Sequence, residues 1–251
     1  MSTPSLILEG HVAWIVLERP ERHNAIQAAD VARLHKHLHA VDADPSVRVL
    51  ILAARGNHTF CSGASLPEIE TGVMSGGLLE KLADRIAAVR VPTVCALSGS
   101  AFGGGAELAL ACDFRIGVHG MRVRIPAARL GLCYPAGGLR RYVAALGVGV
   151  STRLFLGVEE LDADELLRVG FLHSLVSPEE LADTAEEIAA TVSDAAPLAI
   201  QAMKRLLRAS SHGPPDETEA RDLIARCESS DDFREGLLAY REGRRPAFHG
   251  R

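Results

Sequence analysis

The chain has 251 residues, of which 47% are hydrophobic and 24% charged, and its formal net charge is −5. This length fits one folded domain with an appendage, and the acidic balance lacks the clustered positive charge of a nucleic-acid-binding surface. No apolar run is long enough to cross a bilayer, and the N-terminus lacks the basic stretch that opens a signal peptide. We therefore expect a cytoplasmic protein with no nucleic-acid partner and no membrane span.

The first half of the chain alternates strands with helices. Two short strands flank a turn at Glu9-Gly10, and a helix over about 27–41 follows because its apolar residues recur at helical spacing. The unbroken apolar run 47–54 predicts a buried strand. The remaining elements of this half are, in chain order, a loop over 55–65, a glycine-interrupted helical region to about 90, a buried strand over 93–98, a helix after the glycines 103–105 and a strand over 114–118.

The second half reads as helical. From Pro126 onward, glycines and prolines predict short helices separated by breaks. Ser177 to Glu180 combine an N-cap serine, a proline at the first helical position and a glutamate at N3, which predicts a helix start. Helices continue from Pro197 to about Glu242, with a break over 211–216. The fold class is therefore α/β with a helical C-terminal extension.

Metal and disulfide chemistry find little support in the sequence. The cysteines number five, are widely spread and form no CxxC pair, which argues against a zinc site or a disulfide framework. His35, His39 and Asp42 share one helical face, but too few ligands accompany them to complete a coordination shell. We expect an exposed polar face there and no metal.

Two glycine-containing stretches have the same design. TFCSGASLPEI (59–69) and SAFGGGAEL (100–108) each leave a strand, pass through small residues and enter a helix. Glycine permits close approach to the backbone, and the first N–H groups of a helix lack internal partners. Two such ends that face each other would form an oxyanion hole, whereas tight turns with close packing would explain the same glycines equally well. Neither stretch matches a phosphate-binding or dinucleotide-binding motif.

Glu107 is a carboxylate inside the apolar helix start that follows glycines 103–105. Burial would raise its pKa, whereas the positive end of the helix dipole would lower it. A glutamate close to neutrality can take up or deliver one proton, so Glu107 is a candidate acid–base.

Several segments follow one another in a fixed order over about residues 18–248. They are ERPERHNAI, FCSGASL, SGSAFGGGAELALACD, PAARLGL with YPAGGLRR, ADELLRVGFLHSLV and SSDDFREGLLAYREGRRPAF. Together they resemble the motifs of the crotonase superfamily, the enoyl-CoA hydratase/isomerase family. The resemblance implies a spiral of ββα units over residues 1–195 and a helical region over 196–251 that closes the site and builds homotrimers or hexamers.

The resemblance also implies the ligand and the site. The substrate would be an acyl-CoA thioester, with coenzyme A as part of the substrate and no permanently bound cofactor. The N–H groups of Ala64 and Gly104 would form the oxyanion hole and Glu107 would be catalytic. Arg244 or Arg245 would reach a CoA phosphate of a neighbouring subunit. The expected contacts to substrate or CoA are Arg22, Asn24, Ala25, Gly63, Ser65, Leu66, Gly103, Ala127, Leu130, Tyr134 and Arg245.

Two positions depart from the family pattern. Ser65 stands where the family has aspartate, and a serine can hold the loop by capping the helix that follows. Ala127 stands where the hydratases have their second glutamate, so that Glu107 is left to work alone. Tyr134 is the best second polar group, either as a donor to the substrate or, the favoured interpretation, as a ring that packs against the acyl chain. We expect Glu68 and Glu70 to be solvated.

These observations favour an acyl-CoA enzyme, a lyase or isomerase of the hydratase/isomerase type, that stabilises a thioester enolate with Glu107 as sole acid–base. Hydration would be inefficient, because one group must activate water while another manages the proton at the α-carbon. The alternative is a non-catalytic protein that binds or delivers acyl-CoA on the same scaffold.

Overall fold

A computed structural model describes residues 3–211 and 213–251. Its main sheet has the strand order β1-β2-β3-β5-β7-β10, in which only β1 is antiparallel to its neighbour. The predicted hairpin about Glu9-Gly10, the strand near 47–54 and the strand over 114–118 are confirmed. The six strands are β1 (Ser5–Glu9), β2 (Val12–Leu17), β3 (Val49–Ala54), β5 (Thr93–Leu97), β7 (Phe114–Val118) and β10 (Ser174–Val176).

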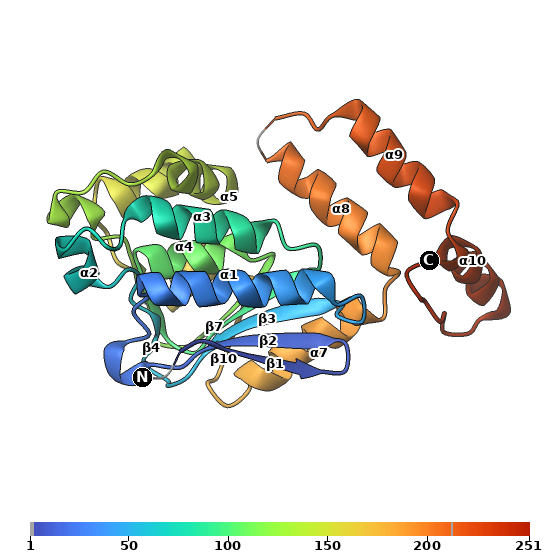
Figure 1. Ribbon diagram of the computed structural model, residues 1–251, viewed down its shortest axis with the longest axis horizontal. Coiled ribbons are helices and arrows are strands. Elements are labelled where there is room, and N and C mark those ends of the chain that lie inside the picture. The colour runs from blue at the N-terminus through green and yellow to red at the C-terminus, as the bar shows by residue number, and fades with distance from the viewer. Residues whose placement is uncertain (1–2, 212) are drawn as a thin grey trace.

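Helices cover both faces of this sheet. Helices α1 (Ala28–Ala43), α3 (Gly76–Ala87) and α4 (Gly104–Ala111) lie together on one face, while α7 (Leu181–Ser193) contacts β3, β5 and β7 from the other (Figure 1). The apolar residues that predicted α1 are all buried in the core, because their spacing places them on one face of the helix. They are Val31, Leu34, Leu38 and Val41.

A second, smaller sheet is made of very short strands that sequence reasoning did not predict. Its order is β4-β6-β8-β9, and the residues 55–65 that were expected to form a loop contain β4. Each of β4, β6 and β8 follows a main-sheet strand directly, so the chain climbs through stacked ββα turns, and the predicted spiral is confirmed. The four strands are β4 (Thr59–Cys61), β6 (Ser100–Phe102), β8 (Arg122–Arg124) and β9 (Leu161–Asp162).

The expectation of short helices separated by breaks after Pro126 is confirmed in part. Helix α5 runs over Ala136–Phe155 through Gly137, Gly138 and Gly149, but Gly147 has non-helical backbone angles (φ +76°, ψ 166°) and divides it into two helical stretches that meet at a kink. The Ser177–Glu180 turn forms, with Ser177 Oγ donating to the Glu180 carboxylate over 2.7 Å, but α7 begins only at Leu181. The shorter helices are η1 (Pro20–Arg22), α2 (Leu66–Glu70), η2 (Ala127–Leu130) and α6 (Ala163–Arg168).

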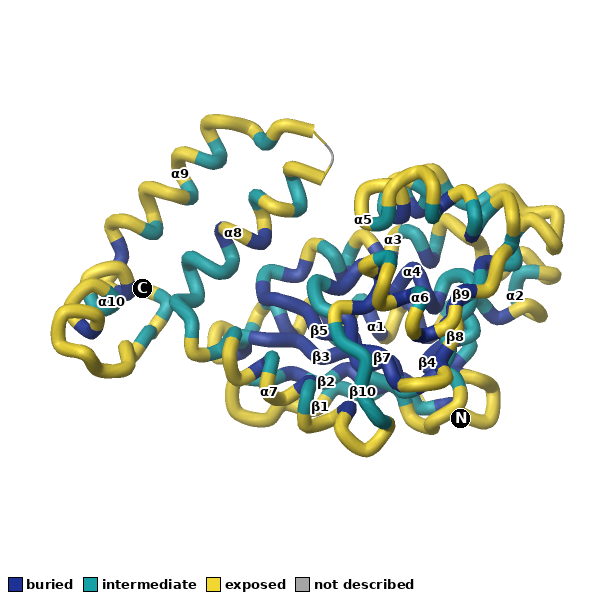
Figure 2. The backbone as a smooth tube through the Cα atoms, turned by 180° about the vertical axis from the view of Figure 1, so that it is seen from behind, coloured by how far each residue is buried: buried dark blue, intermediate teal, exposed yellow. Residues whose placement is uncertain are grey.

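The last quarter is helical, as predicted, and extends away from the core (Figure 1). It consists of α8 (Pro197–Ser210), α9 (Glu217–Glu228) and α10 (Asp231–Glu242). Helix α8 is anchored to the core through Asp113, whose carboxylate pairs with Lys204 at 2.8 Å and Arg208 at 2.9 Å. Most of α9 and α10 is exposed (Figure 2). Within the described residues, no helix has the length and apolarity needed to cross a membrane.

Candidate active site

The loop before α1 is held together by Asn24. This residue is 2% exposed, and its side-chain oxygen accepts from the Arg19 N–H at 2.9 Å while its amide donates to the carbonyls of Arg55 and Thr59. Arg19, which sequence reasoning did not single out, is also buried and pairs with Asp30. The Asn24 side chain therefore braces the loop. Its oxygen and its amide nitrogen both bond to the protein, which leaves neither atom free for the predicted contact with CoA.

The first glycine stretch is fixed to this loop by main-chain hydrogen bonds. The Ile26 N–H donates to the Gly63 carbonyl and the Ser65 N–H donates to the Ile26 carbonyl, each over 2.8 Å. Gly63 has φ +87°, a conformation that side chains disfavour. Ala64 lies between the two bonded residues Gly63 and Ser65, and its own N–H takes part in neither bond.

The two glycine stretches meet at Gly63 and Gly104. A Cβ atom at position 63 would lie 2.9 Å from both the Gly104 nitrogen and the Phe102 oxygen, and one at position 105 would lie 2.2 Å from the Cys61 oxygen. The glycines are thus required by close packing. Within residues 3–211 and 213–251, the N–H groups of Ala64 and Gly104 donate to no other protein group. Gly103, which directly precedes Gly104, is the N-cap of α4 and has φ +49°.

Ser65 and Glu68 behave differently from expectation. Ser65 occupies the N-cap position of α2, but its side chain makes no capping bond; the loop is held instead by the main-chain bonds to Ile26. Glu68 is not simply solvated, because its Oε2 accepts from the N–H of Ala28 at 2.7 Å, the first residue of α1. Glu70 is exposed, as predicted.

Glu107 lies in the first turn of α4 and is only 2% exposed. Its Oε2 accepts a hydrogen bond of 2.7 Å from the Tyr134 hydroxyl. Its Oε1 has no hydrogen-bond partner among the described residues, although the Arg141 Nη2 lies 3.9 Å away. One carboxylate oxygen is therefore fixed by tyrosine. The other, Oε1, is buried but open in the sense that no protein group among the described residues bonds to it.

The surroundings of Glu107 make its carboxylate a stronger base than that of an exposed glutamate. Burial is the largest influence and raises the pKa of Glu107 above its usual value, although the Tyr134 hydrogen bond and the Arg141 charge lower it. Burial also raises the pKa of Tyr134 well above its usual range, and the charge of Glu107 adds to this effect. Tyr134 is consequently a neutral hydrogen-bond donor at physiological pH.

The Tyr134 hydroxyl points to Glu107, which neither of the two sequence-based interpretations foresaw. Its ring meets Phe155 edge to face, with centroids 4.9 Å apart, and also borders Tyr142. The tyrosine is therefore partly an apolar wall, but its polar end binds the carboxylate. Ala127, half-buried at the start of η2, offers only a methyl group.

The other predicted contacts spread around this centre. Ala25 is half-buried in the loop that Asn24 braces. Arg245 belongs to the C-terminal region, which lies at the opposite end of the molecule from α2 (Figure 1), and its predicted contact with a neighbouring subunit stays a prediction. Arg244 is occupied by Glu235 and Glu242. The exposed members of the predicted set are Arg22, Leu66, Leu130 and Arg245.

Sequence reasoning missed a row of charges behind Glu107. Arg141 on α5 donates to Asp84 on α3 at 2.7 Å, and Glu80, one turn earlier on α3, accepts from the Gly137 N–H at 2.6 Å. In the sequence, Arg141 stands out only as the last residue of the YPAGGLRR segment, four residues after Gly137. That position alone does not predict its contact with Asp84.

The stacked ββα turns define a crotonase fold. A family model described as enoyl-CoA hydratase/isomerase matches residues 8–251, and the chain belongs to this enzyme family. It is 30% identical over 244 residues to a short-chain-enoyl-CoA hydratase of Clostridium acetobutylicum, covering 94% of each chain. It is 33% identical over 260 residues to a carnitinyl-CoA dehydratase of Proteus mirabilis, covering 98% of each. Among solved structures, an enoyl-CoA hydratase/carnithine racemase from Magnetospirillum magneticum superposes with a TM-score of 0.93 at 26% identity, covering 100% of this chain and 97% of that one.

Proposed function

We propose that the protein is an acyl-CoA lyase or isomerase that stabilises a thioester enolate, with Glu107 as its only acid–base. The observation that carries the proposal is the state of this carboxylate: it is buried, one oxygen is held by Tyr134 and the other has no partner among the described residues. A buried ionisable group with one open oxygen is suited to proton transfer. Membership of the enoyl-CoA hydratase/isomerase family supports the thioester as substrate.

In the proposed mechanism, the thioester carbonyl oxygen accepts hydrogen bonds from the N–H groups of Ala64 and Gly104. Glu107 removes a proton from the α-carbon through its open oxygen, and the electron pair of the broken C–H bond moves onto the carbonyl oxygen. The two N–H groups stabilise the resulting enolate, and removal of one such donor typically costs about 10²–10³ in rate. Return of the proton to the γ-carbon of an enoyl chain completes an isomerisation.

Efficient hydration is not part of this proposal. Adding water across a double bond requires one group to activate the water while a second supplies the proton. Ala127 provides neither, and Tyr134 is committed to Glu107. The pair of Glu107 and Tyr134 is therefore suited to moving one proton rather than two.

The remaining elements of the proposal concern CoA and assembly. Coenzyme A enters as part of the substrate, with the exposed Arg22 and the backbone near Ala25 as its contacts on this chain and Arg245 of a second copy as a phosphate ligand. A homotrimer or hexamer in the cytoplasm would bring that second copy close. The exposed apolar side chains of the C-terminal helices support assembly, since such patches mark interaction surfaces. They include Ile224, Phe233, Leu237, Leu238 and Tyr240.

The test is an assay panel of 2-enoyl-, 3-enoyl- and 3-hydroxyacyl-CoA substrates with the wild type, Glu107→Gln and Tyr134→Phe. We expect isomerase turnover in the wild type, a loss of about 10²–10⁴ in kcat for Glu107→Gln, and retained acyl-CoA binding in both variants. Full turnover by Glu107→Gln would refute the role of the glutamate. A wild type that binds acyl-CoA but converts none of the panel would instead indicate a binding or delivery protein.

A further inference from the structure

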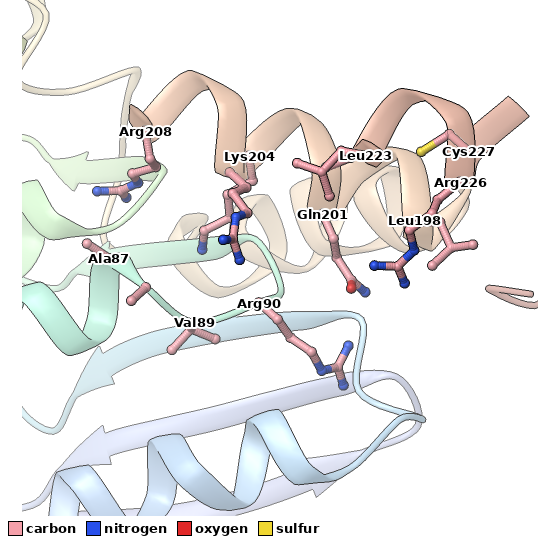
Figure 3. Close-up of a pocket in the computed structure, with 13 residues that line it drawn as sticks. Ala87, Val89, Arg90, Leu198, Gln201, Lys204, Arg208, Leu223, Arg226 and Cys227 are labelled. Atoms are coloured by element: carbon pink, nitrogen blue, oxygen red, sulfur yellow. The ribbon is translucent and has the colours of Figure 1, made fainter. Parts of the chain in front are cut away.

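A cavity lies at the C-terminal end of α3. It measures about 400 Å³ and is bounded by the loop 87–90 that follows α3 and by helices α8 and α9 (Figure 3). No residue that surrounds Glu107 lines it. The charged and polar side chains that line it are Arg90, Gln201, Lys204, Arg205, Arg208 and Arg226.

The lining carries five cations and no carboxylate. Lys204 and Arg208 share the carboxylate of Asp113, and Arg205 pairs with Glu219. Arg226 has no carboxylate partner within the described residues, and Arg90 makes no ion pair there, although its charge helps to lower the pKa of the nearby Asp44 carboxyl. Five cations thus face three carboxylates, those of Asp113, Glu219 and Asp44, which leaves a local charge of +2 in a chain whose net charge is −5. Such a concentration of one sign in a concave site attracts anions.

Arg90 is held rigidly without losing its charge. Its guanidinium donates to the main-chain carbonyls of Asp42, Asp44 and Val47. The carboxylate of Asp42 is turned away from this guanidinium, because it accepts from Arg85 at 2.7 Å and from the Arg90 backbone N–H at 2.9 Å. The three carbonyls fix the head group through Nε and Nη2, and Nη1 keeps its donors without a protein partner among the described residues.

The head groups of Gln201 and Arg226 lie near each other, while the Arg90 guanidinium lies apart from them, beside the carbonyls of residues 42–47 to which it donates (Figure 3). Within the described part of the chain, the side chains of Gln201 and Arg226 have no hydrogen-bond partner. The Arg226 guanidinium and the Gln201 amide can donate to the oxygens of one phosphate group, since arginine binds phosphate through paired N–H donors. Leu198 and Leu223 add apolar wall beside them, and the volume exceeds that of a single phosphate ion.

We propose that this cavity binds the phosphate group of a small organic phosphate, with Arg226 and Gln201 as the principal ligands, Nη1 of Arg90 as a further donor and the leucines against the organic portion. A ligand held in this way connects α9 with the loop after α3 and so ties the C-terminal helices to the core. The site does not depend on the proposed chemistry at Glu107.

The proposal is tested by calorimetric titration with inorganic phosphate and with adenosine 5′-monophosphate, at constant ionic strength set by chloride. We expect saturable binding with one site per chain and an affinity at least ten times weaker in Arg226→Gln. The matched control is Arg221→Gln on the same helix, whose side chain donates to the Glu217 carbonyl outside the cavity; its affinity should equal that of the wild type.

The two probes separate the possible sources of phosphate. Tighter binding of the nucleotide assigns the site to an organic phosphate, whereas equal affinities assign it to free phosphate. Absence of binding by both probes overturns the proposal. Equal weakening in Arg226→Gln and Arg221→Gln also overturns it, because the anion would then respond only to overall charge. Circular dichroism of both variants verifies that the exposed substitutions leave the fold intact.

Discussion

Replacing Asp84 with asparagine is expected to lower the pKa of Glu107, although the two residues do not touch. Arg141 lies between them, with its Nη2 2.7 Å from Asp84 and 3.9 Å from Glu107. Its side chain is 10% exposed, so few other partners are within reach. Once Asp84 loses its charge, the guanidinium will shift onto the open oxygen of Glu107.

The size of the effect follows from the distances. At an effective dielectric constant of about 20, the attraction between Arg141 and Glu107 rises from about 4 to about 6 kcal/mol as the separation shrinks from 3.9 Å to a hydrogen-bonded ~2.8 Å. The gain of about 2 kcal/mol favours the carboxylate over the acid by somewhat more than tenfold. The limb of the kcat/KM profile that Glu107 governs therefore moves to lower pH, whichever protonation form is active.

The assay is the pH dependence of kcat/KM for the best substrate of the panel, with Glu80→Gln as the matched control. Glu80 also raises the pKa of Glu107 by its charge, but it contacts the Gly137 N–H rather than Arg141. A glutamine there keeps the acceptor and removes only the charge. We expect a clearly larger shift for Asp84→Asn than for Glu80→Gln, and in an Arg141→Gln background only a residual shift from Asp84→Asn, no larger than that of Glu80→Gln, because the direct charge of Asp84 alone is then lost. Equal shifts in the two single variants would refute the argument, because simple loss of negative charge would then suffice.

Three further predictions concern the supports of the site. Gly63→Ala should lower kcat by about 10² or more, because the added Cβ would meet the Gly104 nitrogen at 2.9 Å and misplace a donor; near-normal turnover in a folded variant would contradict this. Ser65→Ala should cost less than about 0.5 kcal/mol of unfolding free energy in urea, whereas Glu68→Ala should cost about 1 kcal/mol, because the Ala28 N–H at the start of α1 loses an acceptor that the Gln27–Asp30 capping box does not replace; the reverse order would show that Ser65 caps α2. Asp113→Asn should cost about 3–5 kcal/mol in the same assay, because it strands buried Lys204 without a counter-charge; a change under about 1 kcal/mol would show that α8 is anchored by other contacts.

The Asp113 cluster also sets an acid limit on stability. Burial raises the pKa of Asp113, but attraction by Lys204 and Arg208 outweighs burial and holds the pKa below its usual value. A carboxyl with a depressed pKa contributes stability above its unfolded pKa and loses it as the pH falls through the folded value. The wild type should therefore lose more stability than Asp113→Asn when unfolding is compared between pH 5 and acid conditions.

The elements that the sequence predicted share a strong local pattern. The four apolar positions of α1 and the unbroken run of β3 carry enough periodicity to identify the element and its buried face. Strands such as β4 and β6 are only three residues long, too short for any period, and they exist because neighbouring ββα turns align them. Gly147 interrupts α5 as its sequence predicts, whereas Gly137, Gly138 and Gly149 are accommodated within helical turns.

The candidate site likewise has features that local sequence predicts and features that it does not. The meeting of Gly63 with Gly104 follows from motifs in which glycine is needed for close approach, and the buried Glu107 follows from its apolar surroundings. Other features depend on helices brought together from distant parts of the chain. They are the hydrogen bond from Tyr134, the ion pair of Arg141 with Asp84 and the lack of a capping bond from Ser65. No local pattern encodes such contacts.

The central claim is that Glu107 moves a proton at the α-carbon of a CoA thioester. Exchange of the α-protons of butyryl-CoA for deuterium in D₂O, followed by NMR, measures this step without requiring a complete reaction. We predict exchange at least about 10² faster than in buffer for the wild type and a return to the buffer rate for Glu107→Gln. Exchange by Glu107→Gln at the wild-type rate, or a wild type that binds butyryl-CoA without accelerating exchange, would contradict the claim.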